Sequence, residues 1–127
     1  MKILVVDDEK EACEALVEFL SSENYEVRTA QSGKMALEKV EQETPHLVLL
    51  DIRMPEMDGL ECLRRIKEKD EKIGVIMTTA LNDMGAIKEA LSLGINDYVL
   101  KPIDLDYLGK IIISWKQVFL KEEEEPE

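Results

Sequence analysis

Residues 47–50 read Leu47-Val48-Leu49-Leu50, an unbroken apolar run that ends at Asp51. A strand has this composition when both of its faces are buried, as in a parallel sheet covered by helices on both sides. Four further short runs are candidate strands: residues 3–6, 25–29, 73–77 and 98–100. The run at 25–29 alternates between polar and apolar residues, which favours a place at the edge of the sheet.

Five longer segments between these runs carry apolar residues at helical spacing. They cover about residues 9–21, 32–42, 60–69, 83–93 and 104–120. Asp83 and Asp104 are candidate N-caps for the last two helices, and Gly94 is placed to end the fourth. The alternation predicts an α/β fold of the (βα)5 type. Because crossovers between parallel strands are right-handed, we expect a doubly wound sheet with helices on both faces.

The composition is that of one globular domain. The chain has 127 residues, of which 45% are hydrophobic, too many for a disordered chain. It has 28 acidic and 16 basic residues, a net charge of −12, which argues against non-specific binding to nucleic acid or to an anionic membrane. We expect a folded domain over residues 1–120 and an acidic, frayed tail over residues 121–127.

The two cysteines and the chain start point to a reducing compartment. Cys13 and Cys62 match no zinc-binding spacing, and His46 is the only histidine, so we expect ordinary buried thiols. No apolar run approaches the about 20 residues of a membrane helix. Met1-Lys2 leads straight into a strand-like run rather than a signal peptide. A cytoplasmic location is therefore expected.

Polar side chains follow four of the predicted strands. Ligands of a doubly wound sheet bind at the carboxyl ends of its strands, so these side chains should converge there. They are Asp7, Asp8, Asp51, Thr78, Thr79 and Lys101. Three carboxylates suit a hard cation such as Mg²⁺, completed by water and a backbone carbonyl. An ammonium and a hydroxyl beside them are complementary to a phosphoryl group in transfer, and one carboxylate can itself be the nucleophile.

Each of these motifs also has an unremarkable interpretation. An Asp-Asp pair after a strand is often an N-cap in a solvated turn, and threonine at a strand end is often there for its β-propensity. The functional interpretation depends on all of them falling at the same edge of one sheet.

The motifs together resemble the receiver domain of bacterial two-component response regulators, over Lys2 to about Leu120. The stretches that carry the resemblance are Val5-Val6-Asp7-Asp8-Glu9, Asp51-Ile52-Arg53-Met54-Pro55-Glu56-Met57-Asp58-Gly59, Met77-Thr78-Thr79-Ala80 and Lys101-Pro102. The resemblance implies a flavodoxin-like sheet with strand order 2-1-3-4-5. It also implies a Mg²⁺-dependent signalling switch or phosphorelay intermediate that is phosphorylated by a histidine kinase or a histidine phosphotransfer protein.

The resemblance assigns roles position by position. Asp51 would be the phosphoacceptor, with Asp7, Asp8 and the backbone carbonyl of Arg53 completing the Mg²⁺ ligands. Asp8 is favoured over Asp7 as a direct ligand. Lys101 would contact the phosphoryl group and precede a cis proline, Pro102.

Two further positions match the family's switch. Thr79 directly precedes the small residue Ala80, as the switch hydroxyl does in the family, and Tyr98 matches the aromatic switch position of the fifth strand. Thr78 competes with Thr79, but alternation along a strand would point the two side chains to opposite faces.

Small and apolar residues beside the site offer a surface for a kinase helix pair: Ala12, Ala15, Pro102 and Ile103. The expected molecule is a stand-alone regulator or relay intermediate, with a piece of a longer regulator as the alternative. We expect no direct contact with nucleic acid or membrane, and either a monomer or a weak phosphorylation-dependent dimer.

Two alternative functions share parts of this pattern. A metal-dependent aspartyl-phosphate phosphatase or phosphotransferase usually has a second aspartate two residues after its nucleophile, where this chain has Arg53. A flavodoxin-like FMN-binding protein needs a phosphate-binding loop after the first strand, where Asp7, Asp8 and Glu9 would repel a phosphate. We therefore expect a signalling protein that assists its own phosphorylation and dephosphorylation rather than an enzyme.

Overall fold

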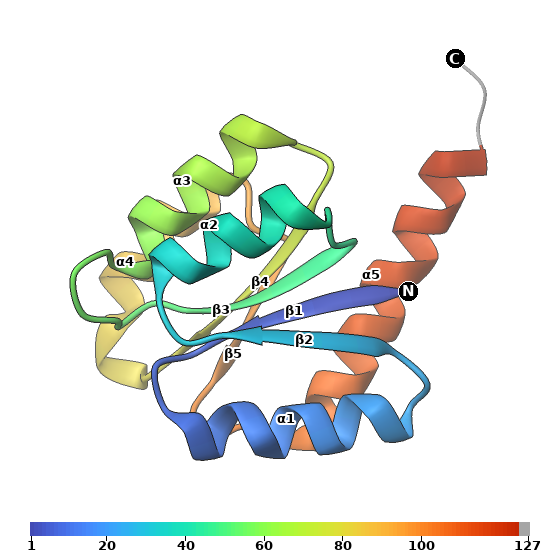
Figure 1. Ribbon diagram of the computed structural model, residues 1–127, viewed down its shortest axis with the longest axis horizontal. Helices are drawn as coiled ribbons and strands as arrows, with labels where there is room; N and C mark the ends of the chain where they lie inside the picture. The colour runs from blue at the N-terminus through green and yellow to red at the C-terminus, as the bar shows by residue number, and fades with distance from the viewer. Residues whose placement is uncertain (125–127) are drawn as a thin grey trace.

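The computed structural model describes residues 1–124 and shows a five-stranded parallel sheet in the order β2-β1-β3-β4-β5 (Figure 1). The predicted (βα)5 fold and its strand order are confirmed. The elements are β1 (Lys2–Val6), α1 (Lys10–Ser22), β2 (Glu26–Ala30), α2 (Gly33–Gln42), β3 (Leu47–Asp51), α3 (Gly59–Lys69), β4 (Gly74–Thr79), the 3₁₀ turn η1 (Leu81–Asp83), α4 (Met84–Ser92), β5 (Asp97–Leu100) and α5 (Leu105–Glu124).

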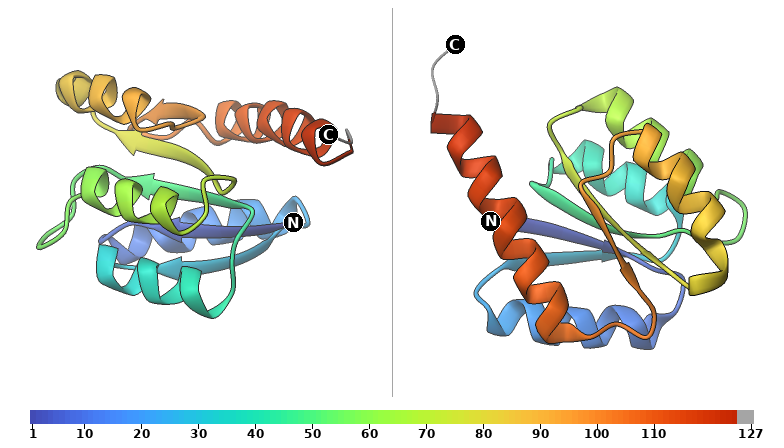
Figure 2. Two further views of the ribbon diagram at one scale, coloured as in Figure 1. Left: turned by 90° about the horizontal axis from the view of Figure 1, so that it is seen from above. Right: turned by 180° about the vertical axis from the view of Figure 1, so that it is seen from behind.

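Helices cover both faces of the sheet, as the views in Figures 1 and 2 show. Leu49 of β3 points to the side of α1 and α5, where it belongs to one core cluster with Leu16 and Leu108. Leu50, the next residue, belongs to the opposite cluster with Val40 of α2 and Leu63 of α3. Because successive side chains of a strand alternate between faces, burial on both sides explains the unbroken apolar run that identified β3. Strand β2, at the edge, is only partly buried, as its alternation predicted.

Side-chain caps set the start of three helices. Ser32 accepts a hydrogen bond from Met35 N at 3.1 Å, and Asp58 accepts one from Glu61 N at 2.9 Å. Asp104 caps α5 as predicted, by accepting from Tyr107 N at 3.1 Å. Asp83 occupies the N-cap position of α4, but it does not cap that helix with its side chain as predicted. The turn η1 precedes α4 and leaves Asp83 at φ −106° and ψ 22°, away from the extended backbone of a capping residue, and its side chain makes no cap hydrogen bond.

The last helix is longer than its sequence pattern indicated. Helix α5 continues to Glu124, four residues into the segment that we expected to be a frayed tail, and its last turns project beyond the sheet (Figure 1). Trp115 is buried and stacks on Phe119 at 5.1 Å between ring centroids, while Phe119 packs edge-on against His46 at 5.8 Å. These aromatic contacts anchor the C-terminal half of α5. The rest of the predicted tail, residues 125–127, lies outside the described residues.

Both cysteines are free and buried, as predicted. Burial raises the pKa of the Cys62 thiol to about 12, so this side chain is protonated at neutral pH and serves only to fill the core. None of the helices in residues 1–124 combines the length and the apolar character that a membrane crossing requires.

Gly59 lets α3 begin directly against the end of β3. A β-carbon at this position would lie 2.7 Å from Ile52 Cα and closer still to the carbonyl oxygen of Asp51. Gly59 N also donates to the Ile52 carbonyl at 2.8 Å. This close approach closes the loop of residues 52–58, so a glycine is required to hold the segment that follows Asp51.

We predict that Gly59→Ala lowers the free energy of unfolding by about 1–3 kcal/mol, because the new methyl group meets backbone atoms that cannot move aside. Gly85→Ala is the matched control in α4, where a β-carbon would meet nothing within 4 Å. It should raise stability by up to about 1 kcal/mol through helix propensity. Urea unfolding followed by Trp115 fluorescence measures both, and equal stability of Gly59→Ala and the wild type would rule out the packing argument.

Candidate functional site

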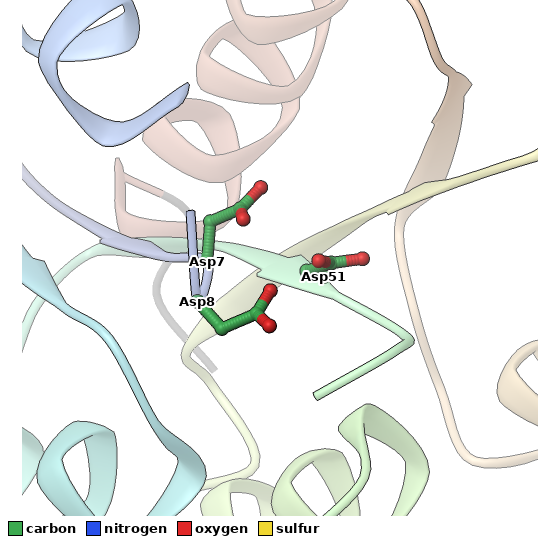
Figure 3. A group of neighbouring side chains, drawn as sticks. All are labelled: Asp7, Asp8 and Asp51. Carbon is green, nitrogen blue, oxygen red and sulfur yellow. The ribbon is translucent and has the colours of Figure 1, made fainter. Parts of the chain in front are cut away.

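Three aspartates meet at the carboxyl ends of β1 and β3 (Figure 3). Asp7 directly follows β1, Asp8 is the next residue, and Asp51 is the last residue of β3. One carboxylate oxygen from each lies within 4.8 Å of the others. Asp7 and Asp51 are buried, whereas Asp8 is exposed, so the cluster opens to solvent on the Asp8 side.

The ammonium of Lys101 joins the two buried carboxylates. Its Nζ lies 3.1 Å from Asp7 Oδ2 and 3.1 Å from Asp51 Oδ2. Lys101 directly follows β5, and its backbone N–H donates to the Thr79 carbonyl at 2.7 Å, which fixes the start of the side chain. The bond from Lys101 to Pro102 is cis, as the family resemblance implied. The Lys101 ammonium thus neutralises part of the negative charge of Asp7 and Asp51.

Backbone N–H groups hold the other oxygen of each buried carboxylate. Asp7 Oδ1 accepts from Glu9 N at 2.9 Å, and Asp51 Oδ1 accepts from Arg53 N at 3.3 Å. Both carboxylates are therefore oriented from two sides, by a main-chain donor and by Lys101.

Burial and neighbouring charges shift the pKa values of Asp51 and Lys101. Burial raises the pKa of Asp51 above its ordinary value; Lys101 opposes this and Asp7 adds to it. For Lys101, burial alone would lower the pKa, but Asp51 and Asp7 outweigh it and the pKa is raised. Lys101 is therefore cationic at neutral pH. The formal charges of three aspartates and one lysine sum to −2, which favours a bound cation.

Two threonines lie at the end of β4, next to β3. Thr78 stands in register with Asp51, and Thr79 follows it; both side chains are buried. The hydroxyl of Thr79 donates to the Ala80 carbonyl at 3.2 Å. Tyr98, on β5 in register with Met77, is half-buried against the core on the side of α2, α3 and α4. In this arrangement the Thr79 hydroxyl bonds to its own loop.

The structure also contains an ion pair at the site that sequence reasoning missed. Arg53 Nε donates to Asp83 Oδ1 at 2.9 Å, and Arg53 Nη2 contacts the same oxygen. The guanidinium holds the pKa of the Asp83 carboxyl below its ordinary value. The signal in the sequence is an opposite pair of charges in the loops after two neighbouring strands, but the N-cap prediction gives Asp83 a different role.

The predicted partner surface is only partly exposed. Ala15 and Pro102 are exposed, Ala12 is half-buried, and Ile103 is half-buried because it packs against the core beside α5. Contact with a partner through this face stays a prediction.

Comparison with known proteins identifies the family. The family model of the response regulator receiver domain matches residues 3–113. This chain belongs to that family. The receiver is 43% identical over 105 residues to sporulation initiation phosphotransferase F of Bacillus subtilis, covering 83% of the chain and 85% of that protein. Among solved structures, the receiver domain protein (CheY-like) from Methanospirillum hungatei matches with a TM-score of 0.91 and 30% identity, over 95% of this chain and 97% of that one.

Other relatives are longer proteins. The receiver is 40% identical to a protein-glutamate methylesterase/protein-glutamine glutaminase of Trichodesmium erythraeum, covering 93% of the chain but 37% of that protein. It is 45% identical to the transcriptional regulatory protein ZraR of Klebsiella oxytoca and spans 24% of its length. The match to these two proteins is thus confined to a part of each, and the activities of the whole proteins do not follow from it.

We predict that Asp51→Asn stabilises the metal-free receiver by on the order of 1 kcal/mol at pH 7, measured by urea unfolding in EDTA. Because the folded-state pKa of Asp51 is raised, its ionised form costs stability at neutral pH, and the wild type recovers that stability as pH falls through the folded pKa. The difference in the free energy of unfolding between Asp51→Asn and the wild type should therefore become smaller towards acid pH. Asp58→Asn, at an exposed cap that asparagine also serves, should change little. A loss of stability in Asp51→Asn would contradict the electrostatic account of the site.

Proposed function

We propose that this receiver accepts a phosphoryl group on Asp51 from a histidine kinase or a histidine phosphotransfer protein and acts as a signalling switch or phosphorelay intermediate. The observation that carries the proposal is the position of the Asp51 carboxylate, buried beside Asp7 and 3.1 Å from the Lys101 ammonium. The near full-length match to a sporulation initiation phosphotransferase supports the relay role.

The acidic cluster would hold Mg²⁺. Asp7, Asp8, Asp51 and the backbone carbonyl of Arg53 offer only oxygen atoms, and few of them, which suits a small hard cation that keeps several waters. When bound, the ion would neutralise charge on the phosphoryl oxygens. Asp8 is favoured as the direct ligand because it is exposed, whereas Lys101 and Glu9 N already engage the Asp7 carboxylate.

The chain's own residues account for the transfer. A carboxylate oxygen of Asp51 attacks phosphorus; the new O–P bond forms as the P–N bond of the phosphohistidine breaks, and the imidazole leaves. The Lys101 ammonium, already beside Asp51, can pair with a phosphoryl oxygen. The Thr79 hydroxyl can exchange the Ala80 carbonyl for the phosphoryl group, because a bond to an anion is stronger than one to a neutral carbonyl. Tyr98 would then move inward, linking the site to the surface as a two-state element.

An aspartyl-phosphate phosphatase or phosphotransferase of the enzyme type is disfavoured. Such enzymes usually have a second aspartate as general acid two residues after the nucleophile, and Arg53 stands there with its guanidinium bound to Asp83. The function proposed is therefore signalling rather than turnover of a substrate.

Residues 1–120 form the receiver domain, which works in the cytoplasm without direct contact with nucleic acid or membrane, as a monomer or a weak phosphorylation-dependent dimer. A kinase helix pair docks on the face that carries Ala15 and Pro102, both exposed beside the site.

Incubation with acetyl phosphate and Mg²⁺, followed by intact mass measurement, tests the acceptor. The wild type should gain the mass of one phosphoryl group, and EDTA or Asp51→Asn should abolish the gain. Asp58→Asn makes the same chemical change on an exposed residue of the loop that follows Asp51 and should leave the gain intact. An undiminished gain in Asp51→Asn would refute the assignment of the phosphoacceptor.

Ala15→Arg tests the docking face. A long charged side chain on the exposed face of α1 should slow transfer from a cognate kinase roughly tenfold, the factor that about 1.4 kcal/mol of lost docking energy gives. Labelling by acetyl phosphate should be unchanged, because the site itself is intact. If both rates fall alike, Ala15 supports the fold and not a partner surface.

A further inference from the structure

We propose that Asp83 is a positioning residue for the metal site: by holding the Arg53 side chain, it fixes the backbone of residue 53, which serves the site directly. The inference rests on the proposed function, because it assigns a metal ligand to the Arg53 carbonyl. It goes beyond that function by giving a role to a residue that neither binds the metal nor touches the phosphoryl group.

The backbone of Arg53 is part of the site. Its N–H donates to Asp51 Oδ1 at 3.3 Å, the carboxylate of the proposed phosphoacceptor. The carbonyl of the same residue is the only main-chain oxygen among the proposed metal ligands. A small rotation of this residue would therefore move two contacts at once.

The side chain of Arg53 is held from across the site. Its Nε and Nη2 converge on one oxygen of Asp83, 30 residues away in sequence, and Nε lies at 2.9 Å. Asp83 ends η1, where its N–H donates to the Ala80 carbonyl at 3.0 Å. The pair thus ties the loop after β3 to the loop after β4.

The two partners differ in burial, and this decides which one orders the other. The Arg53 side chain is 76% exposed, whereas that of Asp83 is 5% exposed. Pairs between two exposed side chains contribute little, but a buried carboxylate that loses its partner is left uncompensated. The buried Asp83, set on a hydrogen-bonded turn, is therefore a fixed anchor, and the otherwise solvated arginine is ordered by it.

The direction of the change in Mg²⁺ affinity distinguishes the positioning role of Asp83 from a simple effect of charge. Arg53→Met removes a positive charge near a cation site, so charge alone predicts tighter metal binding. Asp83→Asn removes a negative charge, so charge alone predicts weaker binding. Positioning predicts that both substitutions weaken binding, because either one releases the backbone of residue 53.

The test is a titration of the full chain with Mg²⁺ by isothermal calorimetry, for the wild type, both single variants and the double variant. We expect each single variant to raise the Mg²⁺ dissociation constant roughly tenfold. The double variant should resemble the single ones, because both changes break the same contact. Tighter or unchanged binding in Arg53→Met, or effects that add in the double variant, would overturn the proposal.

A second measurement, amide hydrogen exchange, tests the same role in the metal-free protein. Amide hydrogen exchange of Arg53 should be faster in Asp83→Asn than in the wild type, and Asp83→Glu should restore part of the protection. Arg53→Met changes an exposed side chain, so this variant can still be compared with the wild type even if Asp83→Asn folds poorly. Wild-type protein that binds no Mg²⁺ would defeat the proposed function itself; wild-type binding and phosphorylation with unaffected variants would defeat only the role of Asp83.

Discussion

The bridge from Lys101 to Asp7 and Asp51 is the interaction on which the site depends. Two carboxylates buried at the ends of adjacent strands repel each other, and burial raises the pKa of Asp51 further. The ammonium at 3.1 Å from each offsets this repulsion and opposes the rise in the Asp51 pKa. In the proposed transfer, ionised Asp51 is the form that attacks phosphorus, so the contact that offsets the buried charge would also keep the proposed nucleophile in its reactive form.

The strand order makes this contact possible. Lys101 and Asp7 are 94 residues apart, yet a parallel sheet in the order β2-β1-β3-β4-β5 places all the carboxyl ends at one edge. Helices on both faces bury that sheet, so the loops at the edge are free to differ while the strand ends stay fixed. Thr79 ends β4, and Arg53 and Asp83 lie in the segments that follow β3 and β4 at this edge. In the proposed mechanism, phosphorylation of Asp51 would be converted into movement there.

Sequence reasoning reached the fold and the convergence of the site because both depend on local patterns. Apolar runs identify strands buried on two faces, and polar residues directly after them must meet at one edge, as Asp7, Asp51 and Lys101 do. The pair of Arg53 and Asp83 could not be found this way, because it depends on the paths of two loops. The C-terminal half of α5 is likewise held by a contact that its own periodicity does not reveal, the edge-on packing of Phe119 against His46.

Chemical trapping of the phosphorylated protein tests the central claim most directly. Sodium borohydride reduces an acyl phosphate to an alcohol, so an aspartyl phosphate becomes homoserine, which peptide mass spectrometry can locate. After incubation with acetyl phosphate and Mg²⁺, the account predicts homoserine at position 51 and at no other aspartate, and none when EDTA is present. Homoserine at position 7 or 8, or none at all in a protein that has gained a phosphoryl group, would contradict it.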